Sequence, residues 1–130
     1  LGSELGLYKD PIQYFGMLSM EMHRAIRLVV DTGIHSKGWT REQAIQYSLD
    51  NEAESEASII AEIERYMATP GQALSYKIGQ LKIRALRDKA EARLGEQFSV
   101  TEFHNQVLNS GSLPLILLES KIDHWIETKI

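Results

Sequence analysis

Tyr76 is the side chain of this sequence best placed to do chemistry, because it lies in the first turn of an expected long helix. A phenol at such a position can donate a hydrogen bond to a developing oxyanion, and the helix dipole favours negative charge nearby. Gln72 and Lys77 flank it and could assist or simply be solvated. The alternative that the sequence leaves open is a core tyrosine with a satisfied hydroxyl.

A second polar group follows helical spacing between residues 23 and 31. His23, Arg24, Arg27 and Asp31 fall on one face of an expected helix, with Arg27 and Asp31 as an i,i+4 pair. This face is either a solvated surface with a weak salt bridge or the polar wall of a cleft, where an arginine can grip a carboxylate through two hydrogen bonds. His35 follows in the expected turn and is either a surface histidine or a functional loop residue.

Several kinds of chemistry have no support in the sequence. No His, Cys, Asp or Glu residues are spaced to bind a metal, and no nucleophile has a base nearby. There is no cysteine, so disulfides and thiol chemistry are excluded. The net charge is -4 and Lys and Arg are interleaved with Asp and Glu, which argues against a nucleic-acid partner. No apolar run approaches the roughly 20 residues that span a bilayer, so we expect no membrane span.

Apolar spacing and capping signals predict an all-α fold, with about six helices in an irregular bundle that forms one domain over residues 1–130. The first helix is expected from Pro11 to about Asp31, closed by Gly33 in the left-handed conformation. Its buried stripe is expected to comprise Phe15, Leu18, Met22, Ala25, Ile26 and Val29.

Five more helices are expected, at about 40–51, 54–67, 72–94 and 99–111 and from Ser112 onward. The fourth helix of the chain has apolar residues on two sides, so both sides should have neighbours. No run of residues alternates strictly between apolar and polar, so no strand is expected.

Several segments together resemble the C-terminal part of the bacterial domain-of-unknown-function 885 family. These segments are RAIRLVVDTGIH (24–35), GWTREQA (38–44), PGQALSYKIG (70–79), FH (103–104) and LPL (113–115). That family consists of longer, mostly helical proteins that resemble zinc peptidases of the gluzincin type, and many carry export signals. Its His-Glu and Pro-Gly-His-His motifs and its later Glu-Gly-Trp segment, which look like the metal site and general base, do not occur in this sequence.

The resemblance implies that this chain is a C-terminal fragment of a larger metallopeptidase-like fold. Ser75-Tyr76-Lys77-Ile78-Gly79 is also similar to a Thr-Tyr-x-Leu-Gly stretch of Taq-type carboxypeptidases, in which the tyrosine faces the scissile carbonyl. Tyr76 then becomes the expected catalytic residue, and the expected substrate-binding residues are Arg27, Asp31, His35, Gln72 and Lys77. The chain itself would hold no metal or other cofactor, and zinc would belong to the full-length protein.

Two classes of function follow from these observations. In the first, the full-length protein is a peptidase whose peptide substrate lies against this chain, and the isolated piece is inactive. The resemblance implies that the full-length protein is exported as a periplasmic protein or lipoprotein. In the second, the chain is a non-catalytic helical module or inactive scaffold that binds a partner through exposed apolar surface. The sequence start at Leu1 suggests a processed or excised piece. Loss of the preceding segments predicts an exposed apolar patch or self-association.

Overall fold

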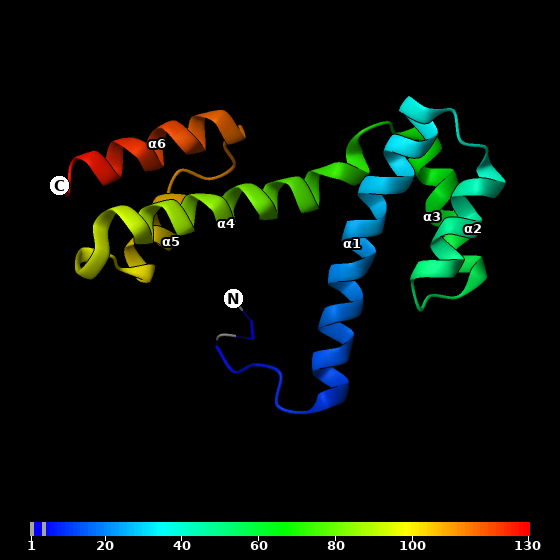
Figure 1. Ribbon diagram of the computed structural model, residues 1–130, viewed down its shortest axis with the longest axis horizontal. Coiled ribbons are helices and arrows are strands. Elements are labelled where there is room, and N and C mark those ends of the chain that lie inside the picture. Colours follow the sequence, from blue (N-terminus) through cyan, green and yellow to red (C-terminus); the bar gives the residue numbers. More distant parts are fainter. Residues whose placement is uncertain (1, 4) are drawn as a thin grey trace. The chain divides into compact units, whose positions relative to one another are not determined.

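A computed structural model describes residues 2–3 and 5–130 of the chain (Figure 1). The described residues form six α-helices and two short 3₁₀-helices without any strand, so the all-α prediction is confirmed. The chain divides into two compact units, of which unit 1 extends to Lys77 and unit 2 comprises Ile78–Ile130. The expectation of a single domain over residues 1–130 stays a prediction.

The helices follow the order in which the sequence places them. Their bounds are α1 (Pro11–Lys37), α2 (Arg41–Asn51), α3 (Glu56–Ala68), η1 (Gln72–Leu74), α4 (Ser75–Leu94), η2 (Gly95–Gln97), α5 (Val100–Leu108) and α6 (Leu115–Glu127). Side-chain caps mark four of the starts, because an oxygen of the residue before the helix accepts a hydrogen bond from a backbone N–H of the first turn. The four capping residues are Asp10, Thr40, Ser55 and Ser99.

The C-terminal end of α1 differs from the prediction. The helix continues past Asp31, and the residue in left-handed conformation is Gly38, with a φ of 70°. Gly33 lies inside the helix, where a Cβ would stand 2.5 Å from atoms of the Trp39 ring. A glycine is therefore required at position 33 for the close approach of the indole, and Gly38 takes the capping role.

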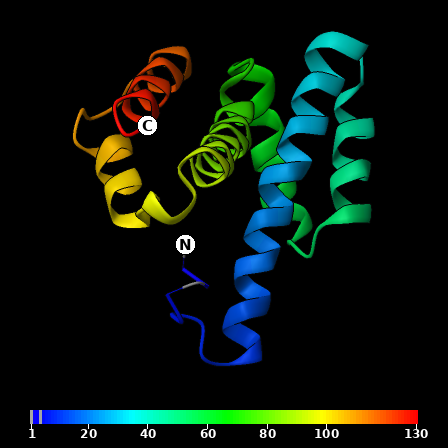
Figure 2. The ribbon, with the colours of Figure 1, turned by 60° about the vertical axis from the view of Figure 1, so that its left-hand side comes forward.

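Unit 1 is built from α1, α2, α3 and η1, which contact one another and lie side by side in both ribbon views (Figures 1 and 2). Its core is apolar and is completed by the half-buried Ile34, Trp39, Tyr47 and Ile60. The buried members of this core are Ile26, Val30, Ala44, Ile45, Ile59, Ile63, Tyr66 and Ala73.

The predicted buried stripe of α1 was wrong for most of its members. Phe15, Leu18, Met22 and Val29 are exposed, with exposed fractions between 37% and 61%. Only Ile26 of the predicted set is fully buried. The buried residues of α1 all lie between Ile26 and Gly33, so Phe15, Leu18 and Met22 in its N-terminal part stay exposed. Val29 lies at the edge of the covered face.

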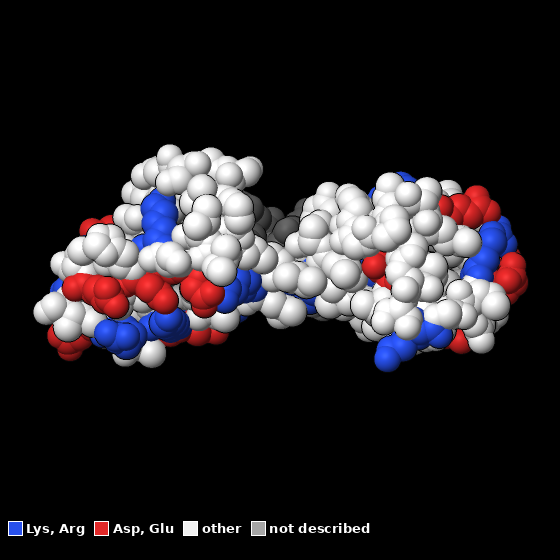
Figure 3. Space-filling view, turned by 90° about the horizontal axis from the view of Figure 1, so that it is seen from above, with Lys and Arg blue, Asp and Glu red and all other residues white. Residues whose placement is uncertain are grey.

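Unit 2 packs α4, α5 and α6 around a second apolar core. The apolar residues Leu118, Ile122, Trp125 and Ile126 of α6 are buried, and Leu115 in its first turn is half-buried. Ion pairs link α4 to α6 at the rim, with distances of 2.7 Å for Lys82–Glu119 and 2.6 Å for Lys89–Asp123. On the face shown in Figure 3, basic and acidic side chains accordingly lie next to one another. Among the described residues, no helix is long and apolar enough to cross a membrane.

Candidate functional site

Unit 1 has a groove of about 420 Å³ that is lined mainly by polar side chains. Its residues come from α1, from the loop before α3, from α3, from η1 and from the first turn of α4. They are Met20, His23, Arg27, Glu54, Ser58, Glu62, Arg65, Gln72 and Tyr76.

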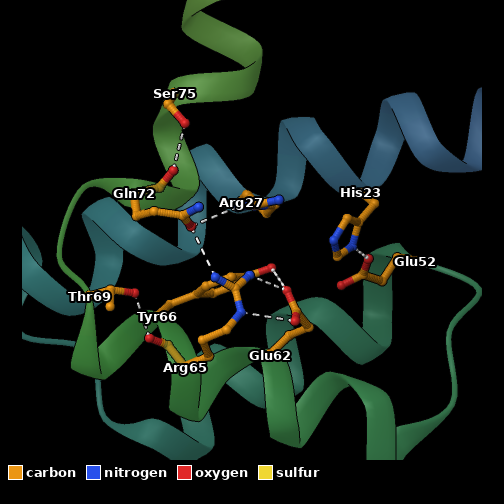
Figure 4. Close-up of polar contacts among 9 residues, drawn as sticks. All are labelled: His23, Arg27, Glu52, Glu62, Arg65, Tyr66, Thr69, Gln72 and Ser75. Atoms are coloured by element: carbon orange, nitrogen blue, oxygen red, sulfur yellow. Dashed lines mark hydrogen bonds and ion pairs between the residues drawn. The ribbon is translucent and has the colours of Figure 1, made fainter.

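Gln72 joins three of these elements through a single amide. Its Oε1 accepts a hydrogen bond from Arg27 Nη2 at 3.2 Å and another from Arg65 Nη1 at 3.0 Å. Figure 4 shows Gln72 between the two guanidinium groups, one from α1 and one from α3. Because both neighbours can only donate, the amide oxygen must face them, and the amide nitrogen remains available as a donor.

Glu62 and Arg65 form a two-point ion pair on α3. Arg65 Nε lies 3.1 Å from Glu62 Oε1, and Arg65 Nη2 lies 2.6 Å from Glu62 Oε2. The buried Tyr66 hydroxyl also donates to Glu62 Oε2, at 2.7 Å. These hydrogen bonds, chiefly those from Arg65, lower the pKa of Glu62 to about 2 against the opposing effect of burial. Burial and the neighbouring Glu62 raise the pKa of Tyr66 well above its usual range.

Two tyrosine rings enclose the guanidinium of Arg27. Its central carbon lies 4.7 Å from the ring centroid of Tyr76 and 5.3 Å from that of Tyr66, both within the range of cation–π attraction. Arg24, one turn earlier on α1, lies 5.6 Å from the Tyr76 ring. The Tyr76 ring belongs to the first turn of α4 and thus contacts two arginines of α1, while 51% of the residue stays exposed. Among the described residues, its hydroxyl has no hydrogen-bond partner.

Arg27 is only 7% exposed, although it carries a full charge. Its Nε is buried and has no hydrogen-bond partner among the described atoms. No described carboxylate lies within ion-pair distance of it, and its one hydrogen bond goes to the neutral amide of Gln72. Since buried charges are normally paired, this guanidinium is the least compensated group of the site.

The structure therefore brings together three of the six residues that the sequence suggested, namely Tyr76, Arg27 and Gln72. Asp31 does not line the groove and is 2% exposed. Its two carboxylate oxygens lie 3.2 and 3.1 Å from the N–H of Gly71, which donates to them. Gly71 has a φ of 80°, so the left-handed turn that leads into η1 and α4 is fastened to α1 by this carboxylate.

His35 and Lys77 do not line the groove. His35 Nε2 lies 3.0 Å from the backbone oxygen of Tyr66, where its ring joins the end of α1 to the end of α3. Lys77 Nζ donates to Glu21 at 3.2 Å and joins α4 to α1. Their assignment as substrate-binding residues stays a prediction, and their contacts here hold the elements of unit 1 together.

Sequence reasoning missed two polar pairs of this site. Glu62 and Arg65 have an i,i+3 spacing that is common on solvated helices, so only the structure shows that they surround a buried tyrosine. A carboxylate oxygen of Glu52 lies 2.6 Å from His23 Nδ1, and the Glu52 side chain is 6% exposed (Figure 4). Nothing in the local sequence links residues 23 and 52.

A metal does not fit the side chains of this site. Among residues 2–3 and 5–130, no three His, Cys, Asp or Glu side chains converge as a metal-binding group. Of the carboxylates near the groove, Glu62 is engaged by Arg65 and Glu52 by His23, so Glu54 is the one that remains among the described residues. A single carboxylate does not make a cation site, whereas the donors of Arg27, Gln72 and Tyr76 suit an anion or a polarised carbonyl.

The comparisons with known proteins place the chain in a family. The model of the family described as "Bacterial protein of unknown function (DUF885)" matches residues 1–122. The chain belongs to this family. A solved structure, that of "the putative lipoprotein from Colwellia psychrerythraea", is 52% identical and superposes over 98% of this chain with a TM-score of 0.96. The chain spans 22% of the length of that protein. No curated protein matches the chain.

Proposed function

We propose that this DUF885 chain is the C-terminal helical part of a zinc-dependent peptidase, in which it supplies one wall of the substrate cleft. In this proposal, Tyr76 donates a hydrogen bond to the oxyanion that forms when the peptide carbonyl is attacked. Zinc would be held by other segments of the full-length protein, because the described residues of this chain include no group that fits it. We also expect the full-length protein to be exported, since its structural relative is described as a lipoprotein.

The observation that carries the proposal is the state of the Tyr76 side chain. Arg27 and Arg24 contact its ring through cation–π interactions. Its hydroxyl has no hydrogen-bond partner among the described residues, and it belongs to a groove that is lined by further donors. A tyrosine that served only packing would bury its ring and satisfy its hydroxyl, as Tyr66 does. The arrangement therefore favours a hydroxyl kept available for a ligand.

The proposal is tested with Tyr76→Phe in the full-length protein. Peptide turnover should fall by about 10²-fold or more, as when an oxyanion donor is removed, because the ring packing survives and only the donor is lost. Tyr47→Phe is the matched control, since Tyr47 packs against Trp39 outside the groove. Turnover that is unchanged in Tyr76→Phe, or equally reduced in both variants, would remove the assigned role.

A second candidate is supported by the exposed apolar face of α1. Phe15, Leu18 and Met22 are 61%, 47% and 51% exposed. Such side chains suit contact with the rest of the same protein, with a second copy or with a partner helix, and an interaction module without catalysis would use them in the same way. Sedimentation of the 130-residue chain should show self-association that Phe15→Glu with Leu18→Glu abolishes. A strictly monomeric chain at high concentration would count against this candidate.

A further inference from the structure

We propose that Arg27 and Gln72 form a binding site for a carboxylate group of a peptide. This inference rests on the proposed function for the identity of the ligand as a peptide, but not for the existence of the site. It specifies the substrate class: peptides that carry a carboxylate close to the bond facing Tyr76. The site is a pair of donors from α1 and η1 that open onto the groove of unit 1.

The first argument is the electrostatic state of Arg27. Arg27 is only 7% exposed, and the loss of water around a buried charge is normally compensated by a carboxylate with matching geometry. Here its guanidinium contacts one neutral amide and two aromatic rings, the carboxylate of Glu62 acts on it through the electrostatic field without forming an ion pair, and its Nε has no acceptor among the described residues. An anionic ligand would provide the direct ion pair that these residues do not.

The second argument is that the neighbouring arginine is occupied and Arg27 is not. Arg65 donates hydrogen bonds from Nε and Nη2 to Glu62 and from Nη1 to Gln72, so its guanidinium is already engaged within the chain. Glu62 is in turn fully engaged by Arg65 and the hydroxyl of Tyr66. The ion pair on α3 therefore acts as a fixed support for Gln72 and leaves Arg27 as the cation available for a ligand.

The third argument concerns the remaining donors of the groove. The groove that Arg27 lines is also lined by Gln72, Tyr76 and Ser58, whose side chains carry further hydrogen-bond donors. Of the two carboxylates that line the groove, Glu62 is paired with Arg65, and Glu54 is exposed in the loop before α3. A peptide carboxylate has two oxygens and accepts from two or more donors at once, which is the pattern that Arg27 and Gln72 offer.

The test is a titration of the ¹⁵N-labelled 130-residue chain, followed by NMR on the Arg27 Nε–H signal and the backbone amides of η1. Three probes separate the sources of the carboxylate. N-acetyl-Gly-Gly carries it at the C-terminus, N-acetyl-Glu-Gly-amide carries it on a side chain, and N-acetyl-Gly-Gly-amide carries none. We expect saturable shifts with at least one of the two acids, and affinity at least about tenfold weaker for the amide, the loss expected when a charge-assisted hydrogen-bond pair is removed.

Variants make the result specific to Arg27. Arg27→Lys keeps the charge but not the fork, so binding should weaken about tenfold while the dispersion of the backbone signals shows that the fold is kept. Arg41→Lys is the matched control, because Arg41 pairs with Glu64 on the outer surface and should not affect binding. Glu54→Gln should leave binding unchanged or tighten it.

The outcomes are distinct from those of the proposed function. Equal binding of acid and amide probes, or full binding by Arg27→Lys, would overturn the carboxylate site whatever the turnover results show. Carboxylate binding together with unchanged turnover in Tyr76→Phe would keep the site and remove the catalytic role of the tyrosine. Loss of both would remove both.

Discussion

Replacing Glu62 by Gln should destabilise the chain in a manner that depends on pH. The pKa of this carboxyl falls from 4.5 to about 2 in the folded chain, chiefly because Arg65 donates two hydrogen bonds to it. The difference of about 2.5 between these two pKa values corresponds to at most about 3.4 kcal/mol of unfolding free energy. Because the Glu62 side chain is 34% exposed, solvent screening reduces the expected loss at pH 7 to about 1 to 2 kcal/mol.

The sign of the pH dependence follows from the lowered pKa. A carboxylate whose pKa is depressed by folding stabilises the folded chain above pH 4.5, the unfolded value, and this contribution is lost as the pH falls toward 2. The difference between Glu62→Gln and the parent chain should therefore drop to less than half by about pH 3. Urea unfolding at pH 7, 5, 4 and 3, monitored by circular dichroism, measures this difference directly.

Glu64→Gln is the control for this prediction. Glu64 lies on the same helix and also pairs with an arginine, Arg41, at 2.6 Å, but its side chain is 53% exposed. Surface ion pairs of this kind contribute little, so the expected loss is at most about 0.5 kcal/mol. Equal losses for the two variants, or a loss in Glu62→Gln that does not change with pH, would refute the interpretation of the Glu62 network as the buried support of the groove.

Two further predictions concern the backbone that positions the groove. Gly33→Ala should destabilise unit 1 by about 1 to 3 kcal/mol, because the new Cβ would stand 2.5 Å from the Trp39 ring. Gly16→Ala in the same helix has open space around the new Cβ and should stabilise the chain by up to about 1 kcal/mol. Chemical denaturation measures both changes, and equal effects would contradict the packing of Trp39 on Gly33. Asp31→Ala should lose about 1.5 to 3 kcal/mol, since the N–H of Gly71 loses its charged and buried acceptor. Hydrogen exchange should then accelerate in residues 69–74 more than in α2, and uniform acceleration would mean that the turn is not fastened by this carboxylate.

The helices of this chain were predictable because the signals that start and stop them are local. Thr40 and Gln43 form a full capping box at the start of α2, and Ser99 caps α5, close to where the sequence predicts these helices to begin. The end of α1 was not predictable in the same way. Gly33 and Gly38 both suit a left-handed cap, and the choice depends on the Trp39 ring, which packs on Gly33 only in the folded unit.

Burial was less predictable than helix position. The apolar residues of α1 follow helical spacing along its whole length, but only contact with α2 and α3 decides which part is covered, so Phe15 and Leu18 stay exposed. The candidate site shows the same division. Tyr76, Arg27 and Gln72 were recognisable by residue type and family resemblance, while the role of Asp31 in fastening the turn depends on a contact across 40 positions.

The distribution of buried polar groups separates the two units of the chain. Every described residue that is polar or charged and fully buried, namely Arg27, Asp31 and Ser48, belongs to unit 1. Unit 2 keeps a wholly apolar core, and its ion pairs between α4 and α6 lie at half-exposed positions. Burying a charge costs several kcal/mol, and Arg27 has one hydrogen bond to an amide, two ring contacts and the electrostatic attraction of Glu62, but no directly paired carboxylate among the described residues. Unit 1 therefore carries a cost that unit 2 does not. A ligand that meets Arg27 in the groove would explain it.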